Sequence, residues 1–253
     1  MELNVINVVV LIAVGIVSGF INTVAGGGSS ITLPVLMFLG LPPAMANGTN
    51  RIAILLQSFA GAETFRKKGL LSWKEGKYFL IPSVVGAMLG AIVAIVLTEK
   101  MMHHVILAVM VAMFFLVLFK PEAWIRQDSS LPHVKRGVMQ WGIYFAIGFY
   151  GGFIQVGVGF LLLAGLVLGS GYGVVKANGL KVLIVLFYTG IALLVFWSSQ
   201  NIHLASGLVL GIASMAGAYA GARFTIQGGV KWIRLFLLVV LFAIIVKLTG
   251  IVF

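Results

Sequence analysis

The segment 19–29 reads GFINTVAGGGS and interrupts an apolar stretch that begins at Val5. The three glycines Gly26–Gly28 break the helical pattern, and the apolar piece that follows runs only over Ile31–Leu41. That piece is too short to cross a hydrocarbon core of ~30 Å at ~1.5 Å per residue. We therefore expect a membrane-spanning helix, a turn at the glycines, and a half-length helix after it.

A second glycine cluster lies in the other half of the chain. Gly157-Val158-Gly159 precedes another short apolar piece, Phe160–Leu168, and an offset of 131 residues places Gly26 on Gly157. The same gapless offset aligns further landmarks: Gly28 with Gly159, Gly40 with Gly171, Ala46-Asn47-Gly48 with Ala177-Asn178-Gly179, Ser83 with Ser214, Gly86 with Gly217, Gly90 with Gly221 and Lys100 with Lys231. One register held over this length indicates an internal duplication. Taken alone, Gly86 and Gly90 would fit close helix packing equally well.

The composition places the chain in the membrane. Of its 253 residues 61% are hydrophobic and only 9% are charged, with a mean hydropathy of +1.14, whereas soluble domains carry roughly 25% charged residues. Apolar stretches of about 20 residues, long enough to span a bilayer, run roughly over Val5–Ile21, Ala44–Phe65, Tyr78–Leu97, Met101–Phe119, Val138–Phe153, Lys176–Trp197, Leu204–Ala222 and Ile233–Phe253. We expect an all-α integral membrane protein with about eight transmembrane helices, plus two short glycine-led half-helices that form hairpins.

The chain divides into two repeats, residues 1–119 and 138–253, which form one transmembrane domain. The segment 120–137 between them is polar and reads as a linker. Cytoplasmic loops retain positive charge, and most Lys and Arg residues fall on one side if each glycine-led pair of segments dips in and returns. Each half then crosses an odd number of times. The halves are therefore predicted to be inverted relative to one another, with a cytoplasmic linker and both termini outside the cytoplasm.

Several chemistries are not signalled by the sequence. The chain has no cysteine, so disulfides and thiolate metal sites are excluded. The formal net charge is +11, and the basic residues lie in short loops between apolar runs. Basic residues at such positions orient membrane helices, so no nucleic-acid partner is expected. No Walker, His-Glu-x-x-His or Gly-x-Ser-x-Gly motif occurs, and the histidines lie at predicted helix ends or in the linker. We expect no catalytic residue, metal or cofactor.

The two glycine turns form the first candidate substrate site. Broken membrane helices expose backbone N–H groups and positive dipole ends, which attract anions and are tolerated only around a cavity. Glycine also lets a ligand approach the backbone closely. The candidates are Asn22, Thr23, Gly26, Gly27, Gly28 and Ser29 in the first half, and Gln155, Gly157 and Gly159 in the second. The alternative is that these glycines only turn the chain or pack helices.

A pair of cations near the start of the following helices forms the second candidate site. Asn47, Asn50 and Arg51 in the first half are matched by Asn178 and Lys181 in the second. A charge in the middle of a membrane helix costs about 2.5–3.5 kcal/mol, so it usually faces a cavity or a partner. Neither cation has an acidic residue nearby in the sequence, and a substrate anion is the predicted counter-charge. The alternative is that both side chains snorkel, because they lie only about two turns into their helices.

These residues resemble those of a known family. Segment 19–29 with Pro34 and Ala46-Asn47-Gly48-Thr49-Asn50, together with segments 151–159 and 177–181, is similar to the TauE/SafE sulfite-exporter-like permeases over essentially the whole chain. The resemblance implies export or exchange of small sulfur-containing anions, such as sulfite or organosulfonates, across the bacterial inner membrane. The second half departs from the first where Val158 stands for Gly27 and Phe160 for Ser29.

Interrupted helices at matching positions of inverted repeats are typical of secondary transporters with a site near the midplane. We therefore expect a multi-pass permease, surrounded by lipid, that holds a small anion between the two glycine turns and works by alternating access. Formation of a homodimer is left undecided by the sequence. Two other functions are also left undecided: a membrane-embedded enzyme or scaffold without transport, and an anion channel. With no plainly buried carboxylate, facilitated efflux or exchange is favoured over proton coupling.

Overall fold

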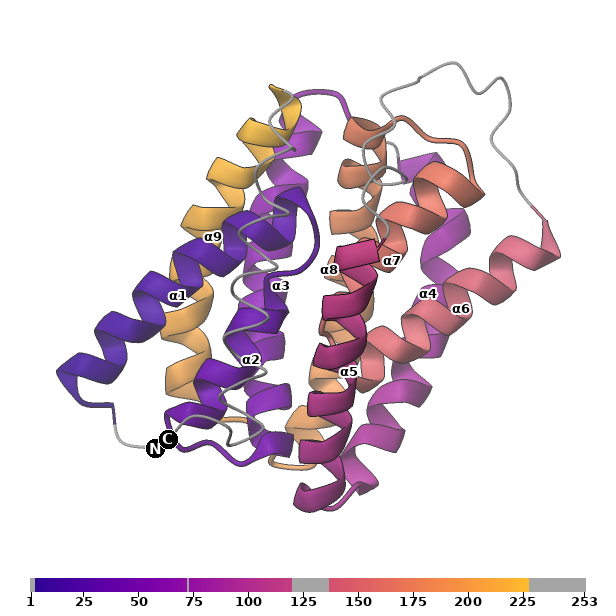
Figure 1. Cartoon of the computed structure of the whole chain (residues 1–253). Helices are drawn as coiled ribbons and strands as arrows, with labels where there is room; N and C mark the ends of the chain where they lie inside the picture. Colours follow the sequence, from indigo (N-terminus) through magenta and orange to yellow (C-terminus); the bar gives the residue numbers. More distant parts are fainter. Residues whose placement is uncertain (1–2, 72, 120–136, 228–253) are drawn as a thin grey trace.

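A computed structural model describes residues 3–71, 73–119 and 137–227 (Figure 1). All regular structure within these ranges is helical: α1 Val5–Val24, α2 Ser29–Phe38, α3 Pro43–Lys67, α4 Trp73–Val96, α5 Glu99–Phe119, α6 Val138–Phe153, α7 Val158–Ala164, the π-helix η2 Gly165–Gly169, α8 Val174–Ser198 and α9 Leu204–Ile226. Four of these helices, α1, α4, α8 and α9, are long and apolar enough to cross a membrane. The predicted all-α membrane protein is confirmed to that extent.

The long helices pack in a row. α1 packs on α9, α9 on α3, α3 on α8, α8 on α4, and α4 on α6. In Figure 1, α1 and α9 therefore form one flank, α4 and α6 form the other, and α3 and α8 lie between them. The two central helices are the ones that carry Arg51 and Lys181.

Each flank is held together by glycines. A Cβ atom added at Gly86 or Gly90 of α4 would collide with the backbone of α6, and one added at Gly217 or Gly221 of α9 would collide with the backbone of α1. Close approach of this kind is how membrane helices gain packing contacts where no water drives them together. The packing expected of Gly86 and Gly90 is therefore present, and their aligned partners have it too.

Both predicted helix breaks are confirmed. Residues 25–28 separate α1 from α2, and residues 154–157 separate α6 from α7. Gly26 has φ +93° and Gly157 has φ +70°, a left-handed conformation that glycine adopts without the steric cost of a Cβ atom. Glycine is therefore required at these two turns by the path of the chain itself.

The short helices also end alike. Gly40, after α2, has φ +96°, and Gly171, after η2, has φ +81°. α2 has 10 residues, and α7 has 7 before it continues as the π-helix. These are the half-length helices that the sequence predicts, although the second is not α-helical throughout.

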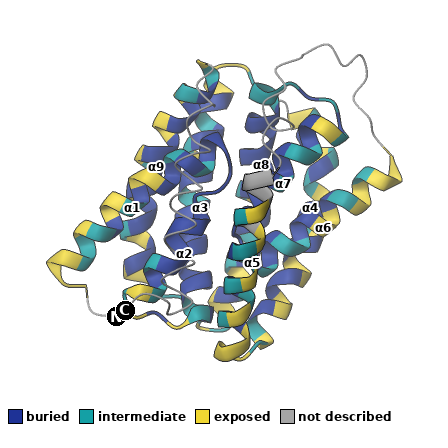
Figure 2. Cartoon of the chain, viewed as in Figure 1, coloured by how far each residue is buried: buried dark blue, intermediate teal, exposed yellow. Residues whose placement is uncertain are grey.

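The outer faces of the bundle are apolar. Figure 2 shows exposed residues along both flanks. Large hydrophobic side chains of the flank helices, such as Ile12 of α1, Val85 of α4 and Ile212 of α9, are exposed. An apolar surface of this extent is unusual for a protein in water and marks contact with another apolar phase. Lipid is the phase that the composition predicts.

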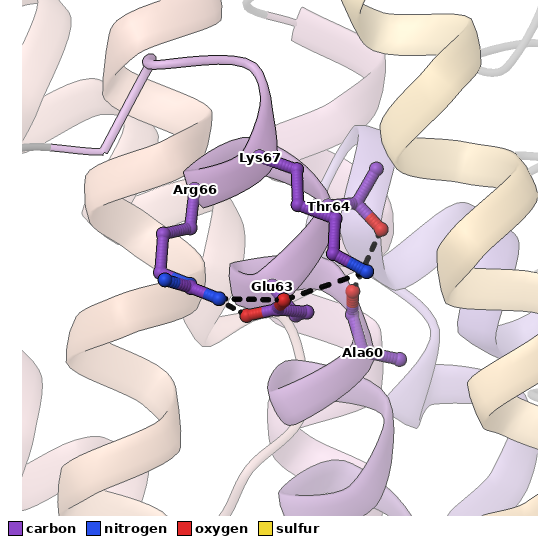
Figure 3. A network of polar contacts seen from close by, with 5 residues as sticks. All are labelled: Ala60, Glu63, Thr64, Arg66 and Lys67. Atoms are coloured by element: carbon purple, nitrogen blue, oxygen red, sulfur yellow. Dashed lines mark hydrogen bonds and ion pairs between the residues drawn. The ribbon is translucent and has the colours of Figure 1, made fainter.

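One end of the bundle carries charge. Glu63 forms ion pairs with Arg66 at 2.7 Å and with Lys67 at 3.6 Å at the end of α3 (Figure 3). At the neighbouring start of α4, Glu75 accepts a hydrogen bond from Lys176 of α8 at 2.8 Å. Arg66, Lys67 and Lys176, which the sequence places on one side of the membrane, thus lie at one end of the helix bundle. Which side of the membrane this end faces stays a prediction.

Two expected segments cannot be compared with the structure. The linker up to residue 136 and the last predicted span, Ile233–Phe253, lie outside the described residues. The number of transmembrane helices and the placement of the termini therefore stay predictions.

Candidate functional site

Arg51 and Lys181 point into the protein interior. Arg51 is 0% exposed and Lys181 is 1% exposed, although both sit on apolar membrane helices. A snorkelling side chain would carry its charge toward the headgroups and water. The snorkelling alternative is therefore wrong for both cations.

Arg51 of α3 binds the carboxyl end of the broken helix α6. Its guanidinium donates hydrogen bonds to the backbone carbonyls of Gly151 and Gly152, the latter at 2.7 Å. The last carbonyls of a helix have no partner within the helix and carry partial negative charge. A buried cation at that position compensates both deficits.

Two amide side chains complete the surroundings of Arg51. The guanidinium donates to Asn47 Oδ1 at 3.3 Å and to Gln155 Oε1 at 3.1 Å. Asn47 Nδ2 in turn donates to the carbonyl of Phe153, the last residue of α6, at 2.9 Å. Asn47 and Arg51 thus hold the same helix end from one turn of α3.

Lys181 of α8 binds the carboxyl end of the other broken helix, α1. Its Nζ donates to the carbonyl of Asn22 at 3.0 Å, to that of Thr23 at 2.7 Å, and to Asn178 Oδ1 at 2.7 Å. An ammonium group has three N–H donors, and all three are used. The two predicted pairs, Asn47 with Arg51 and Asn178 with Lys181, therefore each hold the interrupted helix of the opposite half.

The partners of the two cations are neutral. Within the described part of the chain, neither Arg51 nor Lys181 forms an ion pair with a carboxylate. Neutral oxygens accept hydrogen bonds from both cations, while Arg51 Nε has no partner among the described residues. The full positive charge of each cation remains without a counter-ion there. The predicted anionic counter-charge stays a prediction. No carboxylate among the described residues already takes that role.

The two glycine turns touch each other. A Cβ atom added at Gly26 would overlap the backbone of Gly159, and one added at Gly159 would overlap Gly26. The glycine clusters of the two halves therefore meet backbone to backbone. No substrate fits between these two glycines unless they separate.

A small pocket lies beside this contact, and we call it the Lys181 pocket. It is lined by Asn22, Thr23, Gln57, Ser58, Gln155, Gly159, Lys181, Val182 and Val185. It has room for about one water molecule. Five of the predicted site residues lie on its wall. The other nine lie outside that lining: Gly26, Gly27, Gly28, Ser29, Asn47, Asn50, Arg51, Gly157 and Asn178.

Known proteins share this sequence pattern. The family described as "Sulfite exporter TauE/SafE" matches residues 11–248. The chain belongs to the TauE/SafE family. It is 28% identical to a probable membrane transporter protein, ORF9, of a Sinorhizobium species, over 95% of this chain and 91% of that one. It is 27% identical to probable membrane transporter proteins of Haemophilus influenzae, over 98% and 96%, and of Escherichia coli K12, YfcA, over 91% and 85%. No solved structure matches the chain.

Gln57 and Ser58 are pocket residues of this TauE/SafE chain that the glycine and Asn-Gly patterns do not reveal. Both lie on α3, about two turns after Arg51, inside the predicted span Ala44–Phe65. Polar residues within a membrane helix usually face the bundle interior or a cavity. Two adjacent polar residues in the middle of a span were therefore an available signal.

Four neutral polar side chains of the pocket have no hydrogen-bond partner among the described residues. Thr23, Gln57 and Ser58 are 2%, 4% and 3% exposed, and Asn22 is half-buried. None of these four side chains forms a hydrogen bond with another described residue. Buried polar groups in proteins are nearly always paired. Four unpaired polar side chains around one pocket therefore indicate a place for water or a polar ligand.

Two of the remaining candidates, Asn50 and Gly28, support the short helix α2 and its surroundings. Asn50 Oδ1 accepts a hydrogen bond from Thr32 of α2 at 2.7 Å, and so ties α2 to α3. Gly28 packs so tightly against Ser18 that a Cβ atom there would collide with the Ser18 carbonyl. Among residues 3–71, 73–119 and 137–227, no group of three or more His, Asp or Glu side chains is placed to hold a metal ion.

Proposed function

We propose that this protein is a secondary transporter for a small anion, which binds in the Lys181 pocket. One observation carries the proposal. The buried ammonium of Lys181 has no carboxylate partner among the described residues, and it lies on the wall of a pocket in which four neutral polar side chains are unpaired within the same part of the chain. An anion with hydrogen-bond acceptors would satisfy both the charge and the donors.

The proposed substrate is a sulfur-containing oxyanion or organosulfonate such as sulfite, moved across a bacterial inner membrane. The support is the family description, which names sulfite export, and the names of the relatives, which are membrane transporters. The pocket chemistry agrees with an oxyanion because its free groups are hydroxyls and amides. No carboxylate lines the pocket in the described residues, and so we propose exchange or facilitated efflux.

We further propose that residues 1–119 and 138–253 are inverted repeats. If α1 is exchanged with α6, α3 with α8 and α4 with α9, the row is read in reverse and every helix keeps a matching pair of neighbours. Each broken helix also ends on a cation from the other half. The opposite orientation, the eight spans, the cytoplasmic linker and the external termini rest on the distribution of positive charge in the sequence.

Alternating access is the proposed mechanism. A pocket with room for about one water molecule is closed to an anion of several heavy atoms. Entry then requires the halves to separate where Gly26 and Gly159 meet, with each broken-helix end moving together with the cation that holds it. A binding site between repeats that rock against one another is the common solution in secondary transporters.

The experiment is anion flux in proteoliposomes that contain the full chain and are preloaded with sulfite. We expect saturable efflux that external sulfite accelerates by exchange, which a channel would not show. The variant Lys181→Met should lower the flux at least about tenfold, and Lys181→Arg should retain part of it because the charge remains. Lys176→Met, the same change on the same helix at a half-exposed ion pair outside the pocket lining, is the control. Full flux through Lys181→Met, with the protein folded, would disprove the proposed site.

A further inference from the structure

We infer that the Lys181 pocket selects anions that carry a single negative charge, because one cation supplies the charge while neutral side chains supply the hydrogen bonds. This inference rests on the proposed function and specifies its substrate class. It follows from three properties of the pocket wall: its charge, its free hydrogen-bond donors and its apolar face.

The charge inventory of the wall allows one negative charge. Lys181 is the charged member among the described lining residues. Arg51 lies behind Gln155, to which it donates at 3.1 Å, and is not on the wall. A second negative charge would enter a desolvated site without a counter-ion, which is strongly unfavourable.

The helix end beside Lys181 lowers the available positive charge further. The carbonyls of Asn22 and Thr23 are at the carboxyl end of α1, where a helix carries about half a negative charge. The positive potential that an anion meets in the pocket is therefore weaker than that of an isolated ammonium. This again favours a single negative charge over two.

The hydrogen bonds must come from other groups than Lys181. Its three N–H groups already donate to protein oxygens, so Lys181 acts on the anion through its charge. The amide of Gln155 is also engaged, since its Oε1 accepts from Arg51 and its Nε2 donates to the Tyr188 hydroxyl at 2.6 Å. The free groups are the side chains of Asn22, Thr23, Gln57 and Ser58.

These free groups suit a singly charged oxyanion in either of its common forms. Hydroxyls and amides donate to sulfonate oxygens, and the same groups can accept the proton of a protonated oxyanion such as hydrogen sulfite. Val182 and Val185 add an apolar wall on the Lys181 side. Val185 lies one turn after Lys181 on α8 and so shares its face. This wall fits the methyl or methylene group of a small organosulfonate.

The test compares two probes that differ by one charge at similar size, methanesulfonate and sulfate, both fully ionised near neutral pH. Binding to the purified full chain is measured by calorimetry. We expect methanesulfonate to bind at least about tenfold more tightly than sulfate. In the variant Gln57→Lys, a second cation on the wall should shift that ratio toward sulfate by at least about tenfold. Gln57→Met, of similar length but uncharged, removes the amide from both complexes, so it should weaken binding of both probes by a similar factor and keep their ratio near that of wild type.

Each outcome has one meaning. If wild type binds neither probe and moves no sulfite, the proposed function itself fails. If sulfite is transported but sulfate binds as well as methanesulfonate or better, the charge selectivity is overturned while transport stands. If Gln57→Lys does not fold, Val185→Lys with Val185→Met as its control repeats the test from α8. An unchanged ratio in a folded lysine variant contradicts the inference.

Discussion

Arg51 and Lys181 do the same structural work in the two halves, yet only one of them reaches the pocket. Each is buried on a central helix and binds the last carbonyls of a broken helix from the other half. The residues that present those carbonyls differ. Asn22 and Thr23 present them to Lys181 and add polar side chains to the pocket wall, whereas Gly151 and Gly152 present them to Arg51 and add none.

The glycines on the Arg51 side are required by packing. A Cβ atom at Gly152 would collide with the backbone of Ala87, and one at Gly151 would press on the ring of Tyr188. The Arg51 side is therefore filled by helix packing, and the Lys181 side retains a space with free polar groups. Under the proposed function, Arg51 is a structural cation in one of two repeats and Lys181 is the substrate-binding cation in the other.

The largest effect is expected from Arg51→Met. The change leaves the Gly151 and Gly152 carbonyls and two side-chain amides without their partner in the interior, and each buried acceptor left unpaired costs about 1–3 kcal/mol. We expect loss of folded protein, measured as yield and thermal stability in detergent. Arg66→Met, at an exposed ion pair, should leave both unchanged. If Arg51→Met folds normally and Lys181→Met does not, the roles assigned to the two cations are reversed.

The contact between the two glycine turns gives the next largest effect. Gly26→Ala and Gly40→Ala place the same side chain at nearly the same backbone angle, φ +93° and +96°, but only the first meets backbone atoms of Gly159. We expect Gly40→Ala to cost about 1 kcal/mol from its backbone conformation. Gly26→Ala should cost clearly more and impair flux, because the two halves cannot close. Equal stability and flux in the two variants would show that this contact does not matter for closure.

An effect on affinity without an effect on stability is expected for Ser58→Ala. Its hydroxyl has no partner among the described residues, so removing it deprives the protein of no hydrogen bond. The KM for sulfite efflux should rise about fivefold to tenfold at unchanged thermal stability. Ser83→Ala is the matched control, because Ser83 Oγ donates to the Phe79 carbonyl at 2.8 Å. That variant should lose about 1 kcal/mol of stability and keep its KM; the opposite pattern would remove Ser58 from the site.

The smallest effect is expected at the charged end of α3. Glu63→Gln removes the exposed ion pairs with Arg66 and Lys67 (Figure 3), and such surface pairs contribute at most about 1 kcal/mol. Thermal stability and sulfite flux should both stay within error of wild type. A clear loss of flux would mean that this end takes part in the transport cycle.

Local chemistry explains why much of the fold was predictable. Apolar runs of bilayer length must form helices because lipid offers no partner for the backbone, and glycine clusters break them because only glycine adopts the turns at Gly26 and Gly157. The two cations could be singled out because a charge inside a membrane helix is energetically costly and usually faces a partner or a cavity. Gln57 and Ser58 were missed because their polarity in the middle of a span indicates an interior face of α3 but does not show that this face meets the pocket.

The sequence by itself determined the helical membrane class and both helix breaks, since each follows from the neighbouring residues and the cost of polar groups in lipid. It also singled out the two cations, but it left open whether they snorkel or are buried. Only the tertiary structure decided what the cations bind. Their partners, the carbonyls at the ends of α1 and α6, lie more than 90 residues away along the chain, and backbone carbonyls are present at every residue. The packing of α3 and α8 against the opposite halves selects which carbonyls they meet, and it places Lys181 rather than Arg51 on the wall of the Lys181 pocket.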